Sequence, residues 1–575
     1  MKNQELSKIF FEIANYLEID GVSFKPFAYR KVAMVLDSLK DDVGEIYRNG
    51  GTKALQEIPG VGEGIANAIE EYLKTDKIKQ FEQLKKKLPF KVDELLKVEG
   101  LGPKKIKVLY QKLKVKNLKD LEKAAKAHKI APLFGFGEKT EKNILQGLEF
   151  LKKSKGRFLL GEIMPSVKEV IVRLKNQKEI KAVSVAGSVR RQKETIGDID
   201  ILVVSEDSKE TAKFFVSMPE VEKIWANGET KCSVRFKEGF DIDLRMVEQK
   251  SFGSALQYFT GSKEHNIATR KIAIEKGLKL SEYGVFSGEK QIAGKTEEDV
   301  YKAIGLPYIE PEMRHDDGEI QAALEGKLPV LVELKDIMGD LHCHTVDSDG
   351  ENSIEEMVKA AMDMGYEYVG ISDHTKFLGI TNGSDEKRIL AQREIIGKLN
   401  LKFKSENLKF RVLHGCEVDI TADGTLAMED SILEKMDYVI ASVHSSMKME
   451  KKEITERIIK ALENPNVDIF GHPTGRLLGQ RDEYKMDFDK ILEVAKKTGT
   501  ILEINSSPFR LDLNGFNVRR AKSKGIKMII NTDSHKKEQL DLMEYGIGQA
   551  RRGWAEKADI VNTNSVEELL NYFKK

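Results

Sequence analysis

The fold of the first half of the chain is decided by Ala186-Gly187-Ser188-Val189-Arg190-Arg191 and, just after it, Gly197-Asp198-Ile199-Asp200-Ile201-Leu202-Val203-Val204. β-Branched and apolar residues lead into the first stretch and make up most of the second. This pattern predicts a strand, a turn the size of a phosphate group, and a second strand. Because successive side chains of a strand point to opposite faces, Asp198 and Asp200 share one face. Two carboxylates on one rigid edge favour Mg²⁺, which prefers oxygen ligands.

Two further strands are predicted downstream, over residues 232–236 and 240–245. Asp241 and Asp243 lie in the second of them and also share a face. The spacing alone does not decide which of the two faces Asp198 and Asp200.

Upstream, the first 80 residues show the apolar spacing that is typical of short helices. A glycine turn leads into a helix at residues 58–69 and again at residues 98–106, with a looser third copy at 134–140. The free N–H groups at the start of such a helix can bind a phosphate without reading the base sequence. The copies resemble the helix-hairpin-helix motif, which holds DNA by its backbone. The DNA-binding residues expected from them are Gly60, Gly62, Gly100, Gly102, Lys104 and Lys105.

Positive charge is concentrated around these turns. The whole chain has a formal net charge of only +1. Residues 74–155 contain 23 Lys, no Arg and 10 acidic residues, so the formal net charge of this segment is +13. A Lys-rich segment by itself is often only a solvated surface, but the repeated glycine turns within it favour nucleic-acid binding.

Four motifs occur in order along the first half: Gly-Ser-x-Arg-Arg at 187–191, Gly-Asp-x-Asp at 197–200, Ile-Asp-x-Arg at 242–245 and Tyr-Phe-Thr-Gly-Ser at 258–262. The series resembles the family X DNA polymerases, whose best-known member is DNA polymerase beta, over roughly residues 1–320. The resemblance implies that Asp198, Asp200 and Asp243 are catalytic and hold two Mg²⁺ or Mn²⁺ ions. Such ions activate the primer 3′-hydroxyl and neutralise the triphosphate. The alternative for the three carboxylates is a surface cluster of ion pairs.

The same resemblance implies the residues that bind the nucleotide. Ser188 and Arg191 would contact the triphosphate, and Tyr258, Phe259 and Gly261 would pack on the sugar. Asn266 and Arg270 would lie beside the nascent base pair. The full set is Gly187, Ser188, Arg191, Gly197, Tyr258, Phe259, Gly261, Asn266 and Arg270. Ordinary core packing is the alternative for Tyr258 and Phe259, and it is compatible with the family role.

One departure from the family concerns its lyase activity. Members with this activity carry Lys on the helix after the first hairpin, where this chain has Gly64 and Ala68. Because Schiff-base chemistry requires an amine, we predict no lyase activity of that type. Lys53 or Lys74 would be the substitutes if it were present.

The second half of the chain is rich in histidine: seven of the ten His lie beyond residue 336. Their clusters follow short apolar runs, and amphipathic stretches separate them. Alternation of strand, polar strand end and helix predicts an α/β barrel with its site at the carboxyl ends of the strands. In His342-x-His344 and in Asp533-x-His535, the strand period puts both metal-binding side chains on one face. Imidazoles and carboxylates without thiolate pairs suit a multinuclear hydrolytic site that holds Mn²⁺, Zn²⁺ or Fe²⁺.

These motifs resemble the polymerase and histidinol phosphatase (PHP) domain over nearly all of residues 336–575. The resemblance implies up to three metal ions. Their ligands would be His342, His344, Asp349, His374, Glu417, His444, His472, Asp533 and His535. Asp347 and His414 match no ligand position, whereas Arg476 and Arg510 are candidate phosphate contacts.

The fold class expected is therefore multidomain α+β and α/β. It comprises helical helix-hairpin-helix domains, a nucleotidyltransferase-like palm, a helix-rich thumb and a distorted TIM-like α/β barrel. The expected boundaries are 1–80 for the N-terminal DNA-binding domain, 81–150 for the helix-hairpin-helix fingers, 151–250 for the palm, 251–316 for the thumb, 317–335 for a linker and 336–575 for the PHP domain.

The combination resembles bacterial-type family X DNA polymerases. It implies a polymerase that fills short gaps in base excision repair, with a Mn²⁺-dependent 3′–5′ exonuclease and phosphodiesterase that could also incise abasic sites. Two alternatives stay open: a small-molecule phosphoesterase with a DNA-binding arm, and a non-catalytic scaffold for DNA ends. The expected partners are gapped or nicked DNA, deoxynucleoside triphosphates and repair proteins, with no membrane.

Three Cys are too few for a disulfide framework, and the polar start at residues 1–4 does not read as a signal peptide. We therefore expect the protein in the cytoplasm. Separately, we expect it to be a monomer.

Overall fold

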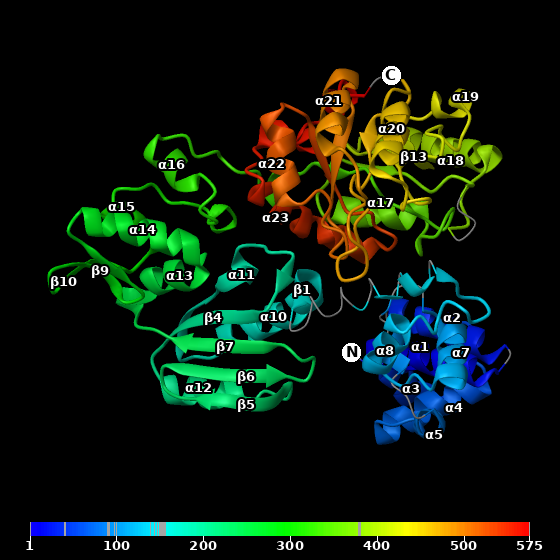
Figure 1. Cartoon of the computed structure of the whole chain (residues 1–575), viewed down its shortest axis with the longest axis horizontal. Coiled ribbons are helices and arrows are strands. Elements are labelled where there is room, and N and C mark those ends of the chain that lie inside the picture. The colour runs from blue at the N-terminus through cyan, green and yellow to red at the C-terminus, as the bar shows by residue number, and fades with distance from the viewer. Residues whose placement is uncertain are drawn as a thin grey trace. The chain divides into compact units, whose positions relative to one another are not determined.

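A computed structural model describes residues 2–22, 24–39, 42–88, 92–96, 98, 101–138, 140–142, 144, 145, 148, 157–377 and 381–573. The chain splits into two compact units (Figure 1). The first comprises residues 1–155 with 479–481, and the second comprises 156–478 with 482–575. Among the described residues, no helix has the length and apolar character needed to cross a membrane.

The first unit is helical. The helices whose bounds lie within its described residues are α1 (Lys2–Asp20), α2 (Lys25–Ser38), α3 (Val43–Gln56), α4 (Glu63–Thr75), α5 (Lys79–Lys87), α6 (Val92–Leu96), α7 (Pro103–Leu113) and α8 (Leu118–Lys126). Their apolar faces form one core, in which Ile65, Ile69, Ile106 and Leu109 are buried. Gly62 and Gly102 cap α4 and α7, and neither cap supplies a side-chain hydrogen bond. The first backbone N–H groups of both helices are thus available to an external acceptor.

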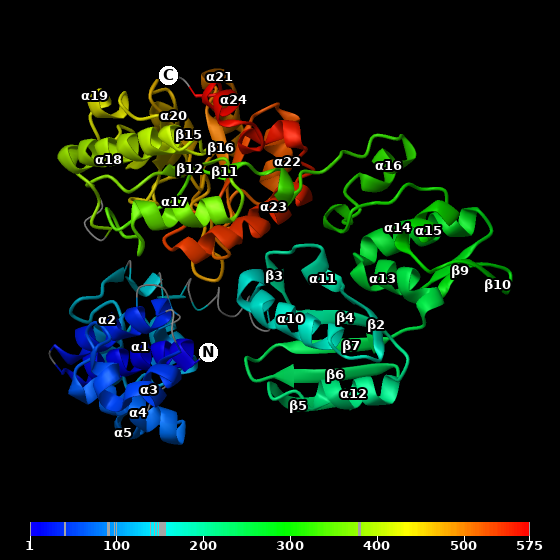
Figure 2. The ribbon, with the colours of Figure 1, turned by 180° about the vertical axis from the view of Figure 1, so that it is seen from behind.

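The second unit begins with a mixed sheet of five strands in the order β2-β4-β7-β6-β5, in which β4 and β7 are parallel. Figure 2 shows α10 and α12 on one face of this sheet, where they cover its apolar side. On the opposite face, α13 (Phe252–Thr260) packs on Leu202 of β4, beside the acidic residues of β4 and β7. The bounds are β1 (Phe158–Leu159), α10 (Leu160–Lys175), β2 (Ile180–Val185), α11 (Gly187–Arg190), β3 (Thr195–Ile196), β4 (Asp198–Ser205), α12 (Ser208–Val216), β5 (Val221–Asn227), β6 (Lys231–Phe236) and β7 (Asp241–Met246).

A helix-rich segment follows, with one small antiparallel sheet. Its buried network joins His265 to Glu319 and Tyr301, and Arg314 to Glu297. The elements are η1 (Gln249–Ser251), α13 (Phe252–Thr260), α14 (Lys263–Glu275), β8 (Lys279–Ser281), β9 (Gly284–Ser287), β10 (Lys290–Ala293), α15 (Glu297–Ala303), η2 (Pro311–Met313) and α16 (Glu319–Leu324).

The last part of the second unit is a nearly closed barrel of seven parallel strands in sequence order, which confirms the predicted α/β barrel. A bridge between Cys343 and Ser534 joins the ends of the first and last strands. The strands are β11 (Gly339–Asp340), β12 (Tyr368–Ile371), β13 (Arg411–Asp419), β14 (Tyr438–Ser442), β15 (Ile469–Phe470), β16 (Ile501–Asn505) and β17 (Met528–Asn531). The helical elements around them are η3 (Leu334–Asp336), α17 (Ile354–Asp363), α18 (Glu386–Ser405), α19 (Asp430–Leu433), α20 (Lys451–Leu462), α21 (Phe488–Thr498), α22 (Gly515–Ser523), η4 (Lys537–Leu542), α23 (Met543–Arg552), η5 (Lys557–Asp559), η6 (Val561–Thr563) and α24 (Val566–Leu570).

Candidate active sites

The register of β4 and β7 places both candidate carboxylates of β7 beside an aspartate of β4. Asp243 is the direct partner of Asp200, whereas Asp241 is the partner of Asp198. The Asp241 carboxylate is already held by the Arg235 guanidinium, through two hydrogen bonds of 2.8 Å. Asp243 accepts from Ser233 Oγ at 2.5 Å and pairs with Lys231 Nζ at 2.7 Å. Asp198, Asp200 and Asp243 form an acidic group on the face opposite α10 and α12, and the charges of Asp198 and Asp243 both act on Asp200.

The acidic group has the electrostatics of a cation site. Burial, and then the charges of Asp198 and Asp243, raise the pKa of Asp200 to about 6. Neighbouring carboxylates destabilise one another in this way unless a cation lies between them. The donor set of oxygens fits Mg²⁺ or Mn²⁺.

At Gly187 the backbone passes so close to the acidic group that only glycine fits. Its φ of +60° lies in the left-handed region, and a Cβ there would lie 2.7 Å from Asp200 Oδ2. A side chain at this position would clash with the carboxylate, so glycine allows the loop to approach the acidic group closely.

A pocket of about 430 Å³ opens beside the acidic group. All nine of the nucleotide-binding residues expected from the sequence line it, together with Asp198 and Asp200. Its volume lies within the usual range for a small-molecule site. Three further cations that the sequence motifs do not indicate also line the pocket: Arg157, Lys193 and Lys263. They lie outside the motifs, and only the folded chain brings them to the pocket.

The two arginines of Gly-Ser-x-Arg-Arg point in different directions. Arg190 forms a salt bridge with Glu297. Arg191 lines the pocket, donates from Nη1 to the Thr260 carbonyl, and has a buried Nε without a hydrogen-bond partner among the described residues. Burial, and then the charge of Arg552, lower the pKa of Arg191 to about 10. A phosphate in the pocket would supply the missing acceptor and counter-charge.

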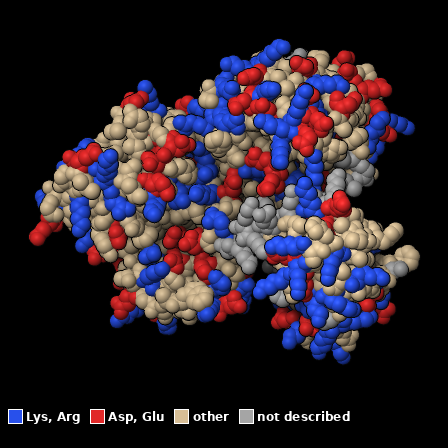
Figure 3. Space-filling model, viewed as in Figure 1, with Lys and Arg blue, Asp and Glu red and all other residues tan. Residues whose placement is uncertain are grey.

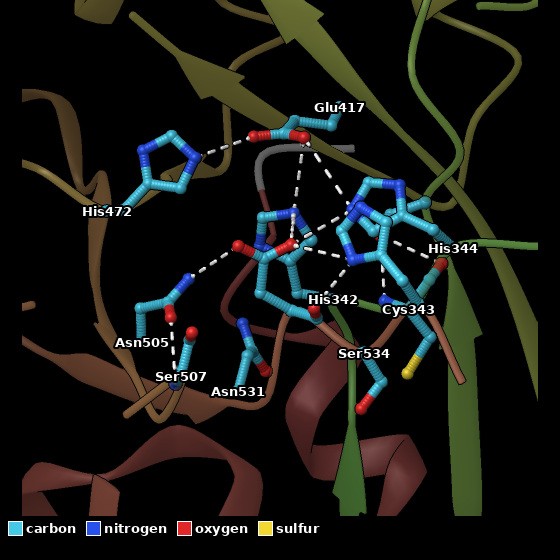
Figure 4. Close-up of polar contacts among 12 residues, drawn as sticks. His342, Cys343, His344, Glu417, His472, Asn505, Ser507, Asn531 and Ser534 are labelled. Carbon is cyan, nitrogen blue, oxygen red and sulfur yellow. Dashed lines mark hydrogen bonds and ion pairs between the residues drawn. The ribbon is translucent and has the colours of Figure 1, made fainter. Parts of the chain in front are cut away.

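The barrel brings eight of the nine expected ligands into three groups whose donor atoms lie within 4.8 Å of one another. These groups are His344, Asp349, His374 and His535; His342, His344 and Asp533; and His374, Glu417 and His444. The ninth residue, His472, lies with Nε2 at 3.0 Å from Glu417 Oε1. Figure 4 shows the side chains of His342, His344, His472 and Glu417 turned toward one another, while the Cys343 sulfur points away.

The chemistry of this cluster fits divalent metal ions. Both ring nitrogens of His344, as well as His342 Nε2 and Glu417 Oε2, are buried without a hydrogen-bond partner among the described residues. Leaving such groups unsatisfied is costly, and metal coordination would satisfy them. Burial, followed by the neighbouring His535 and His374, lowers the pKa of His344 to about 3. Its ring is therefore neutral, which is the form that binds metal.

A second set of residues orients these ligands, and the sequence analysis did not name it. Glu503 Oε1 lies 2.7 Å from His342 Nδ1, and Asp419 Oδ1 lies 2.9 Å from His444 Nδ1. Asn505 Nδ2 donates to Asp533 Oδ2 at 3.1 Å. Such contacts fix the ring orientation and leave Nε2 directed at the metal. The sequence does give one indication of the role of Glu503, because a carboxylate in the apolar run 501–504 needs a buried partner.

Of the other barrel residues named from the sequence, one lies at the metal-ligand groups and three lie away from them. Arg510 Nε lies 3.4 Å from Asp533 Oδ2, at the metal centre. The Arg476 guanidinium instead bonds to Glu194 and to the carbonyls of Arg510 and Leu511. Asp347 accepts from Gln392, and His414 is buried with Nε2 at 3.1 Å from Gln392 Oε1. Neither of these last two residues lies among the ligand groups.

In the helical unit, Gly60 has a φ of +83° in the turn before α4, and Gly62 and Gly102 lie at the helix starts. Lys104 is exposed in the first turn of α7, and Lys105 Nζ lies 5.8 Å from the Phe136 ring centre. Gly100 lies outside the described residues. Figure 3 shows Lys and Arg side chains spread over the visible face of this unit, with acidic groups between them. On α4, Gly64 is exposed and Ala68 is buried. Neither residue has a side-chain amine.

Fold and sites together define a class, in which a palm of the nucleotidyltransferase type and a metal-binding barrel share one chain. Models of known families match each part. Residues 1–78 match a helix-hairpin-helix domain, 92–149 a SAM-like helix-hairpin-helix tandem, 161–228 the DNA polymerase beta palm, 255–315 the DNA polymerase beta thumb and 340–507 the PHP domain.

The DNA polymerase/3′-5′ exonuclease PolX of Bacillus subtilis (strain 168) is 37% identical over 580 residues, which covers 100% of both chains. The chain therefore belongs to the family X DNA polymerases that carry a C-terminal PHP domain. A probable phosphatase of Thermoanaerobacter sp. (strain X514) is 29% identical over 249 residues, covering 41% of this chain and 94% of the relative. The structure of Leishmania infantum polymerase beta in a ternary complex covers 39% of this chain and 97% of that one, at 21% identity and a TM-score of 0.26.

Proposed function

We propose that the protein is a DNA-directed DNA polymerase that fills short gaps in base excision repair. The observation that carries this proposal is the pairing of Asp200 with Asp243 beside a pocket lined by Ser188 and Arg191. In the reaction, the primer 3′-oxygen forms a bond to the α-phosphorus of a deoxynucleoside triphosphate, the bond to pyrophosphate breaks, and the hydroxyl proton leaves to solvent or a base. Two Mg²⁺ or Mn²⁺ ions, when bound by Asp198, Asp200 and Asp243, stabilise the charge that develops.

The chain's own residues bind and orient the nucleotide. Ser188 and Arg191 would hold the triphosphate, with Arg157, Lys193 and Lys263 adding positive charge to the same pocket. Asn266 Nδ2 donates to the Tyr258 carbonyl at 2.7 Å, which fixes the turn on which the sugar would rest. Such orientation is the main contribution a protein makes to phosphoryl transfer.

We propose that the barrel is a 3′–5′ exonuclease and 3′-phosphodiesterase, with incision of abasic sites as a further reaction. His342, His344, Asp349, His374, Glu417, His444, His472, Asp533 and His535 would hold up to three Mn²⁺, Zn²⁺ or Fe²⁺ ions. Bound metal ions there lower the pKa of water and polarise the phosphodiester. Arg510 would contact the phosphate.

A template-directed test addresses the polymerase proposal directly. The protein is given a one-nucleotide gap opposite each template base in turn, with all four deoxynucleotides, and the added nucleotide is identified. The proposal expects the complementary nucleotide in each case. Addition that ignores the template, or no addition to bound DNA, would refute it.

The alternative of a small-molecule phosphoesterase has the barrel's likeness to a probable phosphatase in its favour. It expects turnover of a phosphomonoester that excess gapped DNA does not inhibit. If the barrel instead acts on DNA 3′ ends, gapped DNA will compete with the phosphomonoester.

Gapped or nicked DNA and deoxynucleoside triphosphates are the proposed partners, with the helical unit binding the DNA backbone through its two glycine turns. Cys232, Cys343 and Cys416 are buried and form no disulfide bond with one another, which suits the reducing cytoplasm where we place the protein. The proposed domain boundaries remain 1–80, 81–150, 151–250, 251–316 and 336–575, with a linker at 317–335.

A further inference from the structure

Helix α23 of the barrel packs against the loop that follows α11 in the palm. The two segments lie close together in both views of the ribbon (Figures 1 and 2). Arg552 Nη1 donates to the Arg191 carbonyl at 2.8 Å, and Gln549 Nε2 donates to the Gln192 carbonyl at 3.2 Å. Two successive carbonyls of the palm loop are thus bound by side chains of the barrel.

The packing at this contact is close as well as polar. A Cβ added to Gly548 would lie 2.9–3.1 Å from side-chain atoms of Gln192. Gln192 itself has a φ of +52°, in the left-handed region. A non-glycine residue adopts this conformation only when the surrounding structure enforces it. The contacts from α23 are part of that surrounding structure.

The loop held in this way carries the proposed triphosphate contacts. Lys193 N donates to the Ser188 carbonyl at 3.0 Å, so the loop closes back onto Ser188. The Arg191 and Lys193 side chains line the nucleotide pocket, whereas Gln549 and Arg552 do not reach it. Gln549 therefore acts on that pocket through the loop backbone, and Arg552 acts through the same backbone and through its charge near Arg191.

Gln549 and Arg552 are well placed to hold the loop still. Gln549 is fully buried, and its Oε1 accepts from Gly515 N at 3.3 Å, which anchors the amide at the start of α22. Arg552 is partly buried and lines a neighbouring hollow together with Arg157 and Lys193.

We propose that Gln549 and Arg552 are positioning residues for nucleotide addition, so that the affinity of the polymerase site for nucleotide depends on the hydrolase barrel. The inference rests on the proposed function, in which Ser188 and Arg191 bind the triphosphate. A shift of about 1 Å in the position of a reacting group can lower the rate about 100-fold. Losing the hydrogen bond from Gln549 or from Arg552 should therefore have a measurable effect.

The test is steady-state gap filling by the full-length chain, with the Gln549→Ala, Arg552→Ala and Arg552→Lys variants. We expect Gln549→Ala and Arg552→Ala each to raise KM for the nucleotide about tenfold, the value of one hydrogen bond to a loop carbonyl, with a smaller change in kcat. Arg552→Lys keeps one donor and the charge, and should give an intermediate KM. The 3′–5′ exonuclease rate should be unchanged, which shows that the barrel is folded.

Glu544→Gln is the matched control. Glu544 lies on the same helix and pairs with Lys168 of the palm at 2.5 Å, but it does not touch the loop. Its KM should equal that of the wild type. Wild-type KM in Gln549→Ala and Arg552→Ala, or an equal rise in Glu544→Gln, would overturn the positioning role alone. A wild-type protein that adds no nucleotide would overturn the proposed function and this inference with it.

Discussion

Asp241 and Asp243 share a strand face, yet their surroundings differ. Asp241 lies beside Asp198 and is held by two hydrogen bonds from Arg235, whereas Asp243 lies beside Asp200 and pairs with Lys231. We predict that Asp243→Ala lowers nucleotide addition by at least about 100-fold, because a charge-stabilising group at the reacting centre is lost. Degradation of 3′ ends should be unchanged. Primer extension on gapped DNA measures both activities.

Asp241→Asn is the control for this prediction, since it removes a charge two residues away on the same face. Its rate of extension should stay near that of the wild type. If Asp243→Ala extends primers normally while Asp241→Asn does not, the assignment of the two residues is reversed.

His344 contributes to two of the three ligand groups of the barrel, and Asp533 to one of them. We predict that His344→Ala or Asp533→Ala abolishes 3′–5′ degradation and lowers the number of tightly bound Mn²⁺ ions, because each removes a ligand. Asp347→Asn is the control, since Asp347 lies outside the ligand groups. Metal analysis and exonuclease assays check the prediction, and a His344→Ala variant that degrades DNA at the wild-type rate contradicts it.

His414 gives the barrel a predictable dependence on pH. Burial, and then the charge of Arg393, lower the pKa of His414 to about 3, whereas in an unfolded chain it is about 6.5. As pH falls below 6.5, the unfolded chain binds a proton that the folded chain does not, so stability decreases. Between pH 7 and pH 5 the loss from this residue is about 2 kcal/mol.

The measurement is hydrogen exchange of the β13 amides at pH 7 and pH 5, with chelator present so that metal release does not contribute. Between pH 7 and pH 5, the free energy of opening should fall by about 2 kcal/mol less in the His414→Gln variant than in the wild type. An equal loss in both proteins would show that His414 is protonated in the folded barrel.

At the scale of elements, the start of α7 gives a salt-dependent prediction. Lys104 is exposed in its first turn, next to backbone N–H groups that Gly102 leaves uncapped. If Lys104 neutralises one phosphate, Lys104→Ala will reduce the slope of log affinity against log salt by about 0.9. Lys112→Ala, at the opposite end of the same helix, should leave the slope unchanged. Equal slopes for wild type and Lys104→Ala would exclude this contact.

The elements also show what the sequence could predict. Strand ends bearing His or Asp, and glycine turns before helices, are local patterns, and the α/β barrel and a metal site at its strand ends followed from them, whereas the full ligand sets came from the family resemblance. The choice between Asp241 and Asp243 needed family resemblance, since both lie beside an aspartate of β4 and differ in the partners that only the fold supplies. Glu503, Asp419, Arg157 and Lys193 were missed because their roles arise only when distant segments meet. No local sequence pattern predicts the contact of α23 with the palm loop.

At the scale of the whole molecule, the chain carries two separate sets of residues that could hold metal ions. The acidic group of the palm uses only carboxylates, which suits Mg²⁺, and the barrel adds imidazoles, which suits Mn²⁺, Zn²⁺ or Fe²⁺. Removing one set should spare the chemistry of the other. The contacts of Gln549 and Arg552 add a dependence that runs from the barrel to nucleotide affinity, without involving the barrel's metal ions.

The most direct test of this account is one assay with a 5′-labelled primer in a gapped duplex, Mn²⁺ and the purified protein, with and without deoxynucleotides. We predict primers lengthened through the gap when nucleotides are present and shortened from the 3′ end when they are absent. Asp243→Ala should lose only the first product, and His344→Ala only the second. If both products vanish together in either variant, or if bound DNA is left unchanged by the wild type, the claim of two independent centres is wrong.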